Sequence, residues 1–383
     1  MEFKRILELK PLLQRKSTFL LGPRSSGKTY LYEHTLKPAR VYDLLERQVF
    51  KRLSSRPELL FEECEKPGEL VVVDEIQKLP FLLDEVHRTI EKKNTRFLLT
   101  GSSARKLKRS QANLLGGRAS SAELLPLTYA EIPDFDLMKY LNHGGIPRHY
   151  LCKPDQIEDE LDDYTALYLK EEIKDEAITR NLQDFSRFLE IMALHSGDEL
   201  AIENFASDCQ IKPSTFRNYL SVLEDTLVGF QVPPYLASKK RKAITRSKFY
   251  LFDVGVTGFL AGRLPLKPKS ELFGRSFEHW IALELRAFLK YRRQKLSLCY
   301  WRTTSQFEVD FVIGNEVAIE VKAKALVTEK DLKGLKALAE EKQIKRYIVI
   351  SLDPQKRKLG PFEIYPWETF LKELWSGKVV TPL

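Results

Sequence analysis

The first third of the chain alternates short apolar runs with amphipathic stretches. Apolar runs of this length, bounded by polar residues, are typical of buried parallel strands, and the intervening segments have helical spacing. The predicted strands are 18–21, 39–43, 69–73, 96–100 and 119–125. Because strands and helices alternate, we expect a parallel sheet covered by helices over residues 1–135, where Pro133 breaks the pattern.

The rest of the chain divides into three further units. Residues 136–180 have helical spacing with acidic stretches, which predicts a helical lid. In residues 181–245 three helical segments precede a short strand, an order typical of a winged helix, and a basic linker follows. Residues 246–383 mix strands and helices and form the last predicted domain.

A phosphate-binding motif lies between the first predicted strand and a helix. Residues 22–29 read Gly-Pro-Arg-Ser-Ser-Gly-Lys-Thr, which matches G-x-x-x-x-G-K-[ST] at every defined position. Gly22 and Gly27 allow the backbone to turn its N–H groups inward, and the helix N-terminus adds partial positive charge. Lys28 supplies an ammonium and Thr29 a hydroxyl ligand for Mg²⁺, so the sequence predicts nucleoside triphosphate binding.

Two further strand ends carry residues suited to hydrolysis. Asp74 and Glu75 follow a buried strand, so Asp74 is expected to hold Mg²⁺ and Glu75 to polarise the attacking water. In the alternative, Asp74 only caps the next helix. Thr100 or Ser102 would approach the γ-phosphate, unless this is an ordinary turn. The predicted nucleotide contacts are Gly22, Pro23, Arg24, Ser25, Ser26, Gly27, Lys28, Thr29, Tyr30, Asp74 and Ser102.

A second polar constellation suits nucleic acid. The helix that begins at Pro213 has an apolar stripe, and Arg217 and Asn218 lie on its other face, as in a recognition helix. In the alternative, the winged helix binds protein or bridges domains. The basic linker is either a phosphate-contacting segment or a solvated loop. Its expected contacts are Lys239, Lys240, Arg241 and Lys242.

The C-terminal domain contains an alternating hairpin around residues 314–316. A three-residue loop puts all apolar residues on one face, because it pairs Ile313 with Val317 and Phe311 with Ile319. The other face then sets Asp310 opposite Glu320. Two opposed carboxylates repel each other, and a bound Mg²⁺ would remove that repulsion.

Lys322 lies two residues after Glu320. The three residues thus form the pattern Asp-x9-Glu-x-Lys, which is the acid-acid-lysine pattern of endonuclease-like folds. Glu278, on an upstream helix predicted to open at 276, is the candidate further metal ligand, with Lys322 orienting or activating water. In the alternative, this is a charged outer face with a Glu308–Lys322 ion pair, on a fold without nuclease chemistry.

Several of these motifs together resemble one prokaryotic AAA-type ATPase family, whose C-terminal domain of uncharacterised function resembles the PD-(D/E)xK restriction-endonuclease-like superfamily. The resemblance covers most of the chain. It is carried by the phosphate loop and by residues 74–77, 99–103, 117–118, 126–131, 144–147 and 250–255. It implies an α/β fold with ATP and Mg²⁺ as cofactors. It also implies that Arg118 neutralises the γ-phosphate, in its own or a neighbouring subunit, and that the protein oligomerises, with a ring as the common form. From the sequence alone, Arg118 is one arginine in a Gly-Gly-Arg turn.

Composition adds a weaker argument. The net charge of +9, from 62 basic and 53 acidic residues, suits an anionic partner such as DNA. The four cysteines form no C-x-x-C pair and no apolar run is long enough to span a membrane, which favours a reduced, cytoplasmic protein.

Three hypotheses follow from the sequence. The first is a DNA-processing ATPase, with branched or single-stranded DNA as a guess by analogy. The second is a nucleotide-dependent switch, or a toxin or defence regulator, that binds protein and carries a silent nuclease-like domain. The third is a true nuclease gated by ATP.

Overall fold

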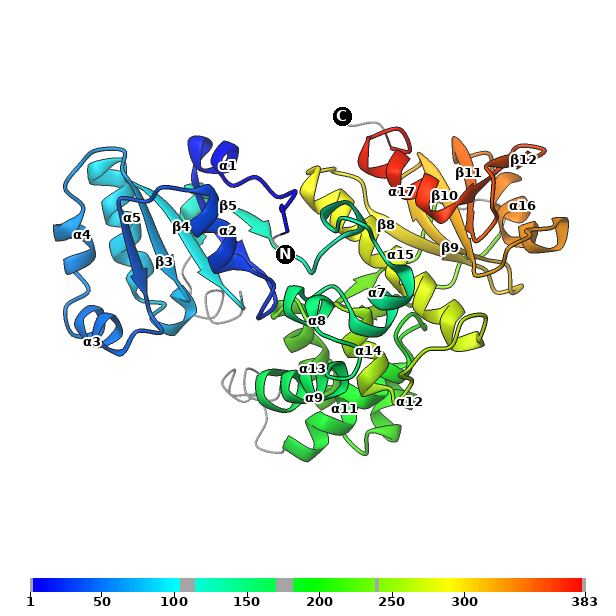
Figure 1. Ribbon diagram of the computed structural model, residues 1–383, viewed down its shortest axis with the longest axis horizontal. Coiled ribbons are helices and arrows are strands. Elements are labelled where there is room, and N and C mark those ends of the chain that lie inside the picture. Colours follow the sequence, from blue (N-terminus) through cyan, green and yellow to red (C-terminus); the bar gives the residue numbers. More distant parts are fainter. Residues whose placement is uncertain (1–2, 104–113, 170–181, 238–240, 381–383) are drawn as a thin grey trace.

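The computed structural model describes residues 3–103, 114–169, 182–237 and 241–380. Figure 1 shows three groups of elements: a sheet with its helices at the blue end of the chain, a second sheet at the red end, and a mainly helical group between and below them. None of the described helices combines the length and the hydropathy that crossing a bilayer requires.

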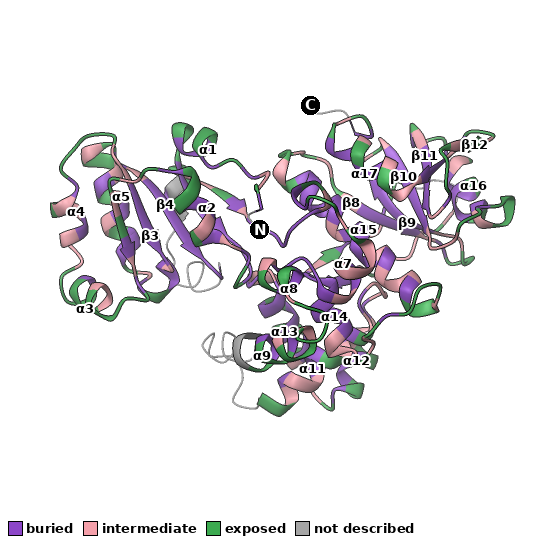
Figure 2. Ribbon diagram, in the orientation of Figure 1, coloured by how far each residue is buried: buried purple, intermediate pink, exposed green. Residues whose placement is uncertain are grey.

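The N-terminal sheet is parallel and has the strand order β2-β3-β4-β1-β5. Its strands are β1 (Ser17–Leu21), β2 (Arg40–Asp43), β3 (Leu70–Asp74), β4 (Arg96–Gly101) and β5 (Ala119–Glu123). All five predicted strands are present, and β4 lies between β1 and β3. The central strands are buried on both faces, which explains why they read as continuous apolar runs (Figure 2).

Helices precede the first strand and connect the others. They are α1 (Lys10–Arg15), α2 (Lys28–Thr35), α3 (Arg47–Ser55), α4 (Leu59–Glu63) and α5 (Leu82–Lys93), with short turns η1 (Ile76–Lys78), η2 (Leu114–Gly117) and η3 (Tyr129–Glu131). Because every strand of a parallel sheet runs the same way, the carboxyl ends of β1, β3 and β4 meet at one edge, where the motif residues lie.

The helical stretch expected after Pro133 is divided into several pieces. They are α7 (Leu137–His143), α8 (Pro147–Leu151), α9 (Ile157–Asp163) and η4 (Tyr164–Leu169). The break after α7 has a clear cause. Gly144 has φ +81°, and a Cβ atom there would lie 2.0 Å from the carboxylate of Asp253. The Gly145 N–H donates to the same carboxylate at 2.7 Å, so two distant motifs meet here.

The elements of the predicted third unit are present, but the unit extends beyond residue 245. Its helices are α11 (Leu182–Leu194), α12 (Ile202–Asp208) and α13 (Pro213–Asp225), followed by the antiparallel pair β6 (Gly229–Val232) and β7 (Lys248–Leu251) and by α14 (Val254–Leu260). Strand β7 belongs to the unit because it pairs with β6 and shares its core, as does α14. The apolar stripe of α13, including Phe216 and Leu223, is buried against α11 and α12. This order suits a winged helix, and that assignment stays a prediction.

The C-terminal sheet is mixed, with the strand order β12-β13-β11-β10-β9-β8. Its strands are β8 (Leu298–Arg302), β9 (Glu308–Ile313), β10 (Val317–Lys322), β11 (Arg346–Ser351), β12 (Arg357–Leu359) and β13 (Phe362–Pro366). The helical elements around it are α15 (Glu271–Tyr291), η5 (Glu329–Leu332), α16 (Lys333–Ala339) and α17 (Trp367–Trp375). Helix α15 begins at Glu271 rather than near 276, because Ser270 caps it by accepting from the Phe273 N–H at 3.1 Å.

The hairpin register is confirmed where the two strands pair. Ile313 lies opposite Val317 and Phe311 opposite Ile319. Beyond these pairs the strands separate, because the Asp310 carboxylate accepts a hydrogen bond from the Val321 N–H at 2.7 Å. Strand β8 pairs with both ends of β9, including Glu308 and Val309, where no β10 partner lies opposite, and its register shifts between Cys299 and Trp301.

Candidate functional site

The phosphate loop joins β1 to α2 with the backbone geometry that its glycines permit. Gly27 has φ +93°, a conformation that favours glycine. At Gly22, a Cβ atom would lie 2.3 Å from the carbonyl oxygen of Leu124, so only glycine fits there. The Lys28 ammonium donates to the carbonyls of Gly22 and Pro23 at 2.8 and 3.2 Å, across the mouth of the loop.

The loop contains a polar group that fits a phosphate oxygen. The Ser26 hydroxyl is buried, and among the described residues it has no hydrogen-bond partner. A buried hydroxyl without a partner is costly, so a ligand acceptor at this position would be favourable. Together with Lys28 and the adjacent helix N-terminus, Ser26 makes the loop suitable for a triphosphate.

Asp74, at the end of β3, accepts hydrogen bonds from three hydroxyl groups. Its carboxylate accepts from Thr29 at 3.1 Å and from Tyr32 at 3.0 Å, and it also accepts from Thr100. Burial and the neighbouring Asp74 charge raise the pKa of Tyr32 above its ordinary value, so this phenol remains a donor. The pairing of Thr29 with Asp74 brings together the two residues expected to hold Mg²⁺, and their oxygen donors suit that ion.

Glu75 is held from two sides. Its backbone is left-handed at φ +60°, and its N–H donates to the Thr100 hydroxyl at 3.2 Å. The Gln77 amide donates to the Glu75 carboxylate and, at 3.2 Å, to Ser102. Gly101 permits this approach, since a Cβ atom there would lie 2.5 Å from the Gln77 carbonyl oxygen. Sequence reasoning missed the roles of Tyr32 and Gln77, although Tyr32 lies one helical turn after Thr29.

An apolar cavity of about 260 Å³ adjoins the phosphate loop. Gly27 and Tyr30 form its wall on the loop side. The other walls come from the N-terminal segment, the stretch after β5, and α8. These lining residues are Phe3, Arg5, Leu127, Pro147 and Leu151. A mostly apolar cavity beside a phosphate site has the character expected for a nucleotide base.

Two side chains from outside the motif hold the loop backbone. Arg5 is buried and donates to the carbonyl of Ser26 at 2.9 Å and to the carboxylate of Glu131 at 3.0 Å. Tyr164, which follows α9, donates to the carbonyl of Arg24 at 3.1 Å. The segment predicted as a lid therefore contacts the phosphate loop. Neither contact has a local sequence signal, because each joins residues far apart in the chain.

Comparisons with known proteins agree with this geometry. Residues 14–133 match the family model of an AAA domain. The chain therefore carries an AAA-type ATPase domain. Residues 134–267 and 273–370 match two further models, each described only as a domain of unknown function (DUF8612 and DUF4143).

Relatives that match most of this chain occur in bacteria and archaea. Uncharacterized protein Rv2008c of Mycobacterium tuberculosis is 26% identical over 82% of this chain and 72% of its own length. Uncharacterized protein MJ1544 of Methanocaldococcus jannaschii is 27% identical over 82% of this chain and 75% of its own. The crystal structure of protein VC1899 from Vibrio cholerae aligns with a TM-score of 0.20 and 12% identity over 94% of this chain and 96% of its own.

Arg118 lies at the far edge of the AAA domain from the phosphate loop. Parallel pairing sets Ser17, at the start of β1, beside Ala119, whereas the loop follows Leu21 at the other end of that strand. Four strand residues separate the two edges by about 13 Å. Arg118 forms an ion pair with Glu91, and this position does not fit contact with its own nucleotide. Supply of Arg118 to a neighbouring subunit's nucleotide stays a prediction, as does the alternative of an arginine in an ordinary turn.

The carboxylates of the C-terminal hairpin are buried rather than solvated. Burial and the adjacent Glu320 charge raise the pKa of Asp310 well above its ordinary value. Burial likewise raises the pKa of Glu320 to about 7, although the nearby Lys322 opposes this. Lys322 contacts Glu320 at 2.5 Å. The alternative that predicted a Glu308–Lys322 ion pair is wrong. The strands separate at Asp310, so Lys322 pairs with Glu320 and Glu308 pairs with Lys248.

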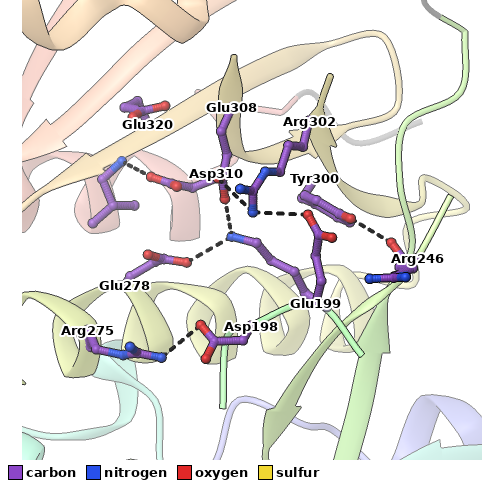
Figure 3. Close-up of polar contacts among 12 residues, drawn as sticks. Asp198, Glu199, Arg246, Arg275, Glu278, Tyr300, Arg302, Glu308, Asp310 and Glu320 are labelled. Carbon is purple, nitrogen blue, oxygen red and sulfur yellow. Dashed lines mark hydrogen bonds and ion pairs between the residues drawn. The ribbon is translucent and has the colours of Figure 1, made fainter. Parts of the chain in front are cut away.

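Glu308 instead contacts Lys248, which projects from β7. The Lys248 ammonium lies 2.7 Å from Glu308 and 3.4 Å from Glu278, and Tyr250 donates to Glu278 at 2.9 Å. Burial alone would lower the pKa of Lys248, but the carboxylates around it raise that pKa well above its ordinary value. Figure 3 shows Glu278, Glu308 and Asp310 converging from α15 and β9, with Arg302 beside them.

Three of these acids were the expected metal ligands. Within the described parts of the chain, no group of three or more His, Cys, Asp and Glu side chains is placed to hold one metal ion. A metal at Glu278, Asp310 and Glu320 therefore stays a prediction.

The expected nucleic-acid contacts have different surroundings. Arg217 and Asn218 are exposed on α13, although Arg217 pairs with Glu203 at 3.0 Å. Arg241 binds Glu340 at 2.5 Å and the carbonyl of Ala337 at 2.8 Å, so it is tied to the C-terminal domain. Lys242 is exposed, and Lys239 and Lys240 lie outside the described residues.

Proposed function

We propose that this protein binds and hydrolyses ATP with Mg²⁺, and that the nucleotide state controls how the 181–245 unit and the C-terminal domain engage DNA. The arrangement of Lys28, Thr29, Asp74 and Glu75 at one sheet edge carries the nucleotide part of this proposal. Lys28 and Ser26 would bind phosphate oxygens, Thr29 and Asp74 would hold Mg²⁺, and Glu75 would accept a proton from water.

Bound Mg²⁺ would neutralise phosphate charge during hydrolysis. The chain's own residues prepare the site for this. Thr100 and Tyr32 fix the Asp74 carboxylate by donating to it, and Gln77 sets the direction of the Glu75 carboxylate. The apolar cavity beside Gly27 would receive the base and exclude water from one side of the site.

DNA is the proposed partner for two reasons. The chain has a net charge of +9, and the exposed face of α13 presents Arg217 and Asn218 beside a buried apolar stripe. The test is steady-state ATP turnover with duplex, single-stranded and branched DNA, with an acidic polypeptide as the control polyanion. Stimulation of turnover by one DNA form above the control supports the proposal, and equal turnover with all polymers contradicts it.

A nucleotide-dependent switch that binds protein is the second candidate. The ion pairs of the C-terminal domain favour it. Lys248 pairs with Glu278 and Glu308, and Lys322 pairs with Glu320, so these acids are already neutralised without a catalytic metal. This candidate predicts slow ATP hydrolysis that DNA does not alter. It also predicts no Mg²⁺- or Mn²⁺-dependent cleavage, whereas a nuclease would lose cleavage in Asp310→Asn and keep its ATPase activity.

A further inference from the structure

The acidic cluster of the C-terminal domain contains a cation that belongs to another part of the chain. Glu278 comes from α15, and Glu308 and Asp310 come from β9, whereas Lys248 is the first residue of β7. The Lys248 side chain is only 5% exposed. Its ammonium contacts Glu308 and Glu278 and lies 5.4 Å from the centre of the Tyr300 ring.

Lys248 is held in this position by its own backbone. It pairs with Val232 of β6 and forms an isolated bridge with Glu199, both outside the C-terminal domain. Movement of β7 relative to β9 would therefore carry the ammonium away from Glu278 and Glu308. The ion pair of Arg275 with Asp198, at 2.8 Å, spans the same junction and would have to break as well.

A second observation points to a missing ligand. Glu320, which adjoins Asp310, is 7% exposed, and one of its carboxylate oxygens is buried without a hydrogen-bond partner among the described residues. Lys322 satisfies only the other oxygen. A buried carboxylate oxygen without a donor is unfavourable, and a hard cation is a suitable partner for it.

The site is also accessible to a small ion. A cavity of about 350 Å³ lies against Lys248, Glu278 and Glu308 on one side and Asp198 and Glu199 on the other. Its polar walls would let a hydrated divalent cation approach. Arg275 and Arg302 also line it, and Lys248 adds the positive charge that contacts both Glu278 and Glu308.

We propose that Lys248 is a built-in counter-ion that competes with Mg²⁺ or Mn²⁺ for the carboxylates of Glu278, Glu308, Asp310 and Glu320. In this arrangement the site is closed to divalent cations, and displacement of β7 opens it. The inference rests on the cation site predicted from the sequence at Glu278, Asp310 and Glu320, and adds its control by the preceding unit.

The test is Mn²⁺ binding to the full chain without nucleotide, measured by electron paramagnetic resonance of free Mn²⁺. Lys248→Met keeps the length of the side chain and removes its charge. We expect Mn²⁺ to bind about tenfold more tightly to this variant, because a repelling charge close to the ion is gone. Adding Asp310→Asn should abolish the gain. Lys356→Met, at an exposed lysine paired with Glu373, is the matched control and should change nothing.

Removing one partner of a buried ion pair is destabilising, so Lys248→Gln serves as a second variant that keeps a hydrogen-bond donor without charge. If both variants unfold, added Mn²⁺ should restore their melting temperature, and failure of this rescue would overturn the inference. If wild type already binds Mn²⁺ through Asp310 and Lys248→Met is no tighter, only the counter-ion inference fails. If no folded variant binds Mn²⁺ through Asp310, the proposed cation site itself fails.

Discussion

Arg5 donates a hydrogen bond to the hydroxyl of Tyr291, 286 positions further along the chain, at 3.3 Å. The same guanidinium donates to the carbonyl of Ser26 in the phosphate loop. Tyr291 is the last residue of α15, whose first half carries Glu278. A single buried side chain thus joins the nucleotide site to the helix that borders the acidic cluster.

Loss of Arg5 should therefore destabilise the protein strongly. Arg5→Met leaves the buried carboxylate of Glu131 without its ion-pair partner, and we expect the free energy of unfolding to fall by about 3 kcal/mol. Chemical denaturation near neutral pH measures this loss. Arg15→Met, at an exposed position on α1, is the control and should cost no more than about 0.5 kcal/mol. Equal losses in the two variants would contradict a structural role for Arg5.

Glu75→Gln should separate nucleotide binding from hydrolysis. The amide keeps the contact with Gln77 but is a poor proton acceptor, so turnover should fall at least about 100-fold while ATP affinity stays unchanged. Single-turnover hydrolysis and equilibrium binding of a fluorescent ATP analogue measure the two quantities. Glu62→Gln, at an exposed acid of the same domain, should leave both unchanged. Full hydrolysis in Glu75→Gln would assign the proton acceptor elsewhere.

Arg118 should act on a nucleotide held by a neighbouring subunit. Lys28→Ala and Arg118→Ala should each abolish ATPase activity alone. Mixed, the two variants should regain activity, because one subunit supplies an intact phosphate loop and the other an intact arginine. Turnover of the mixture against each variant alone is the measurement, with analytical ultracentrifugation to establish that subunits associate. An active Arg118→Ala protein would remove this residue from catalysis.

Glu284 should make stability depend on pH. Burial raises the pKa of Glu284 to about 7, and its carboxylate accepts from the Tyr129 N–H at 2.7 Å and the Trp375 indole at 2.9 Å. The folded state holds this proton more tightly than the unfolded chain. The stabilisation is therefore complete below the ordinary glutamate pKa of 4.5 and is lost as the pH rises through about 7.

The comparison of wild type with Glu284→Gln isolates this contribution. Between roughly pH 5 and roughly pH 8, wild type should lose on the order of 2 kcal/mol more unfolding free energy than the variant. Denaturant titrations at both pH values measure the difference. Glu271→Gln, at an exposed position of the same helix, should follow wild type. A variant with the full pH dependence of wild type would place the titrating group elsewhere, for example at Asp253, whose pKa burial raises to about 6.

Local sequence signals predicted the strands of the AAA domain and the edge at which the motif residues meet. The five strands of the AAA domain lie where their apolar runs are, and Lys28, Thr29, Asp74 and Glu75 meet at one edge because parallel strands end together. The hairpin register at Ile313 and Val317 also followed from the sequence, since a shift by one residue would expose every apolar side chain.

The sequence by itself determined which chemical groups are available: a phosphate loop, an acidic pair after β3, and an acid-acid-lysine hairpin. Only the tertiary structure decided their partners. It paired Glu308 with Lys248 rather than Lys322, placed Arg118 away from its own phosphate loop, and buried Arg5 between that loop and α15. Periodicity reports which face of an element is buried, but an ion pair between distant segments depends on how whole units pack, and no local pattern encodes that packing.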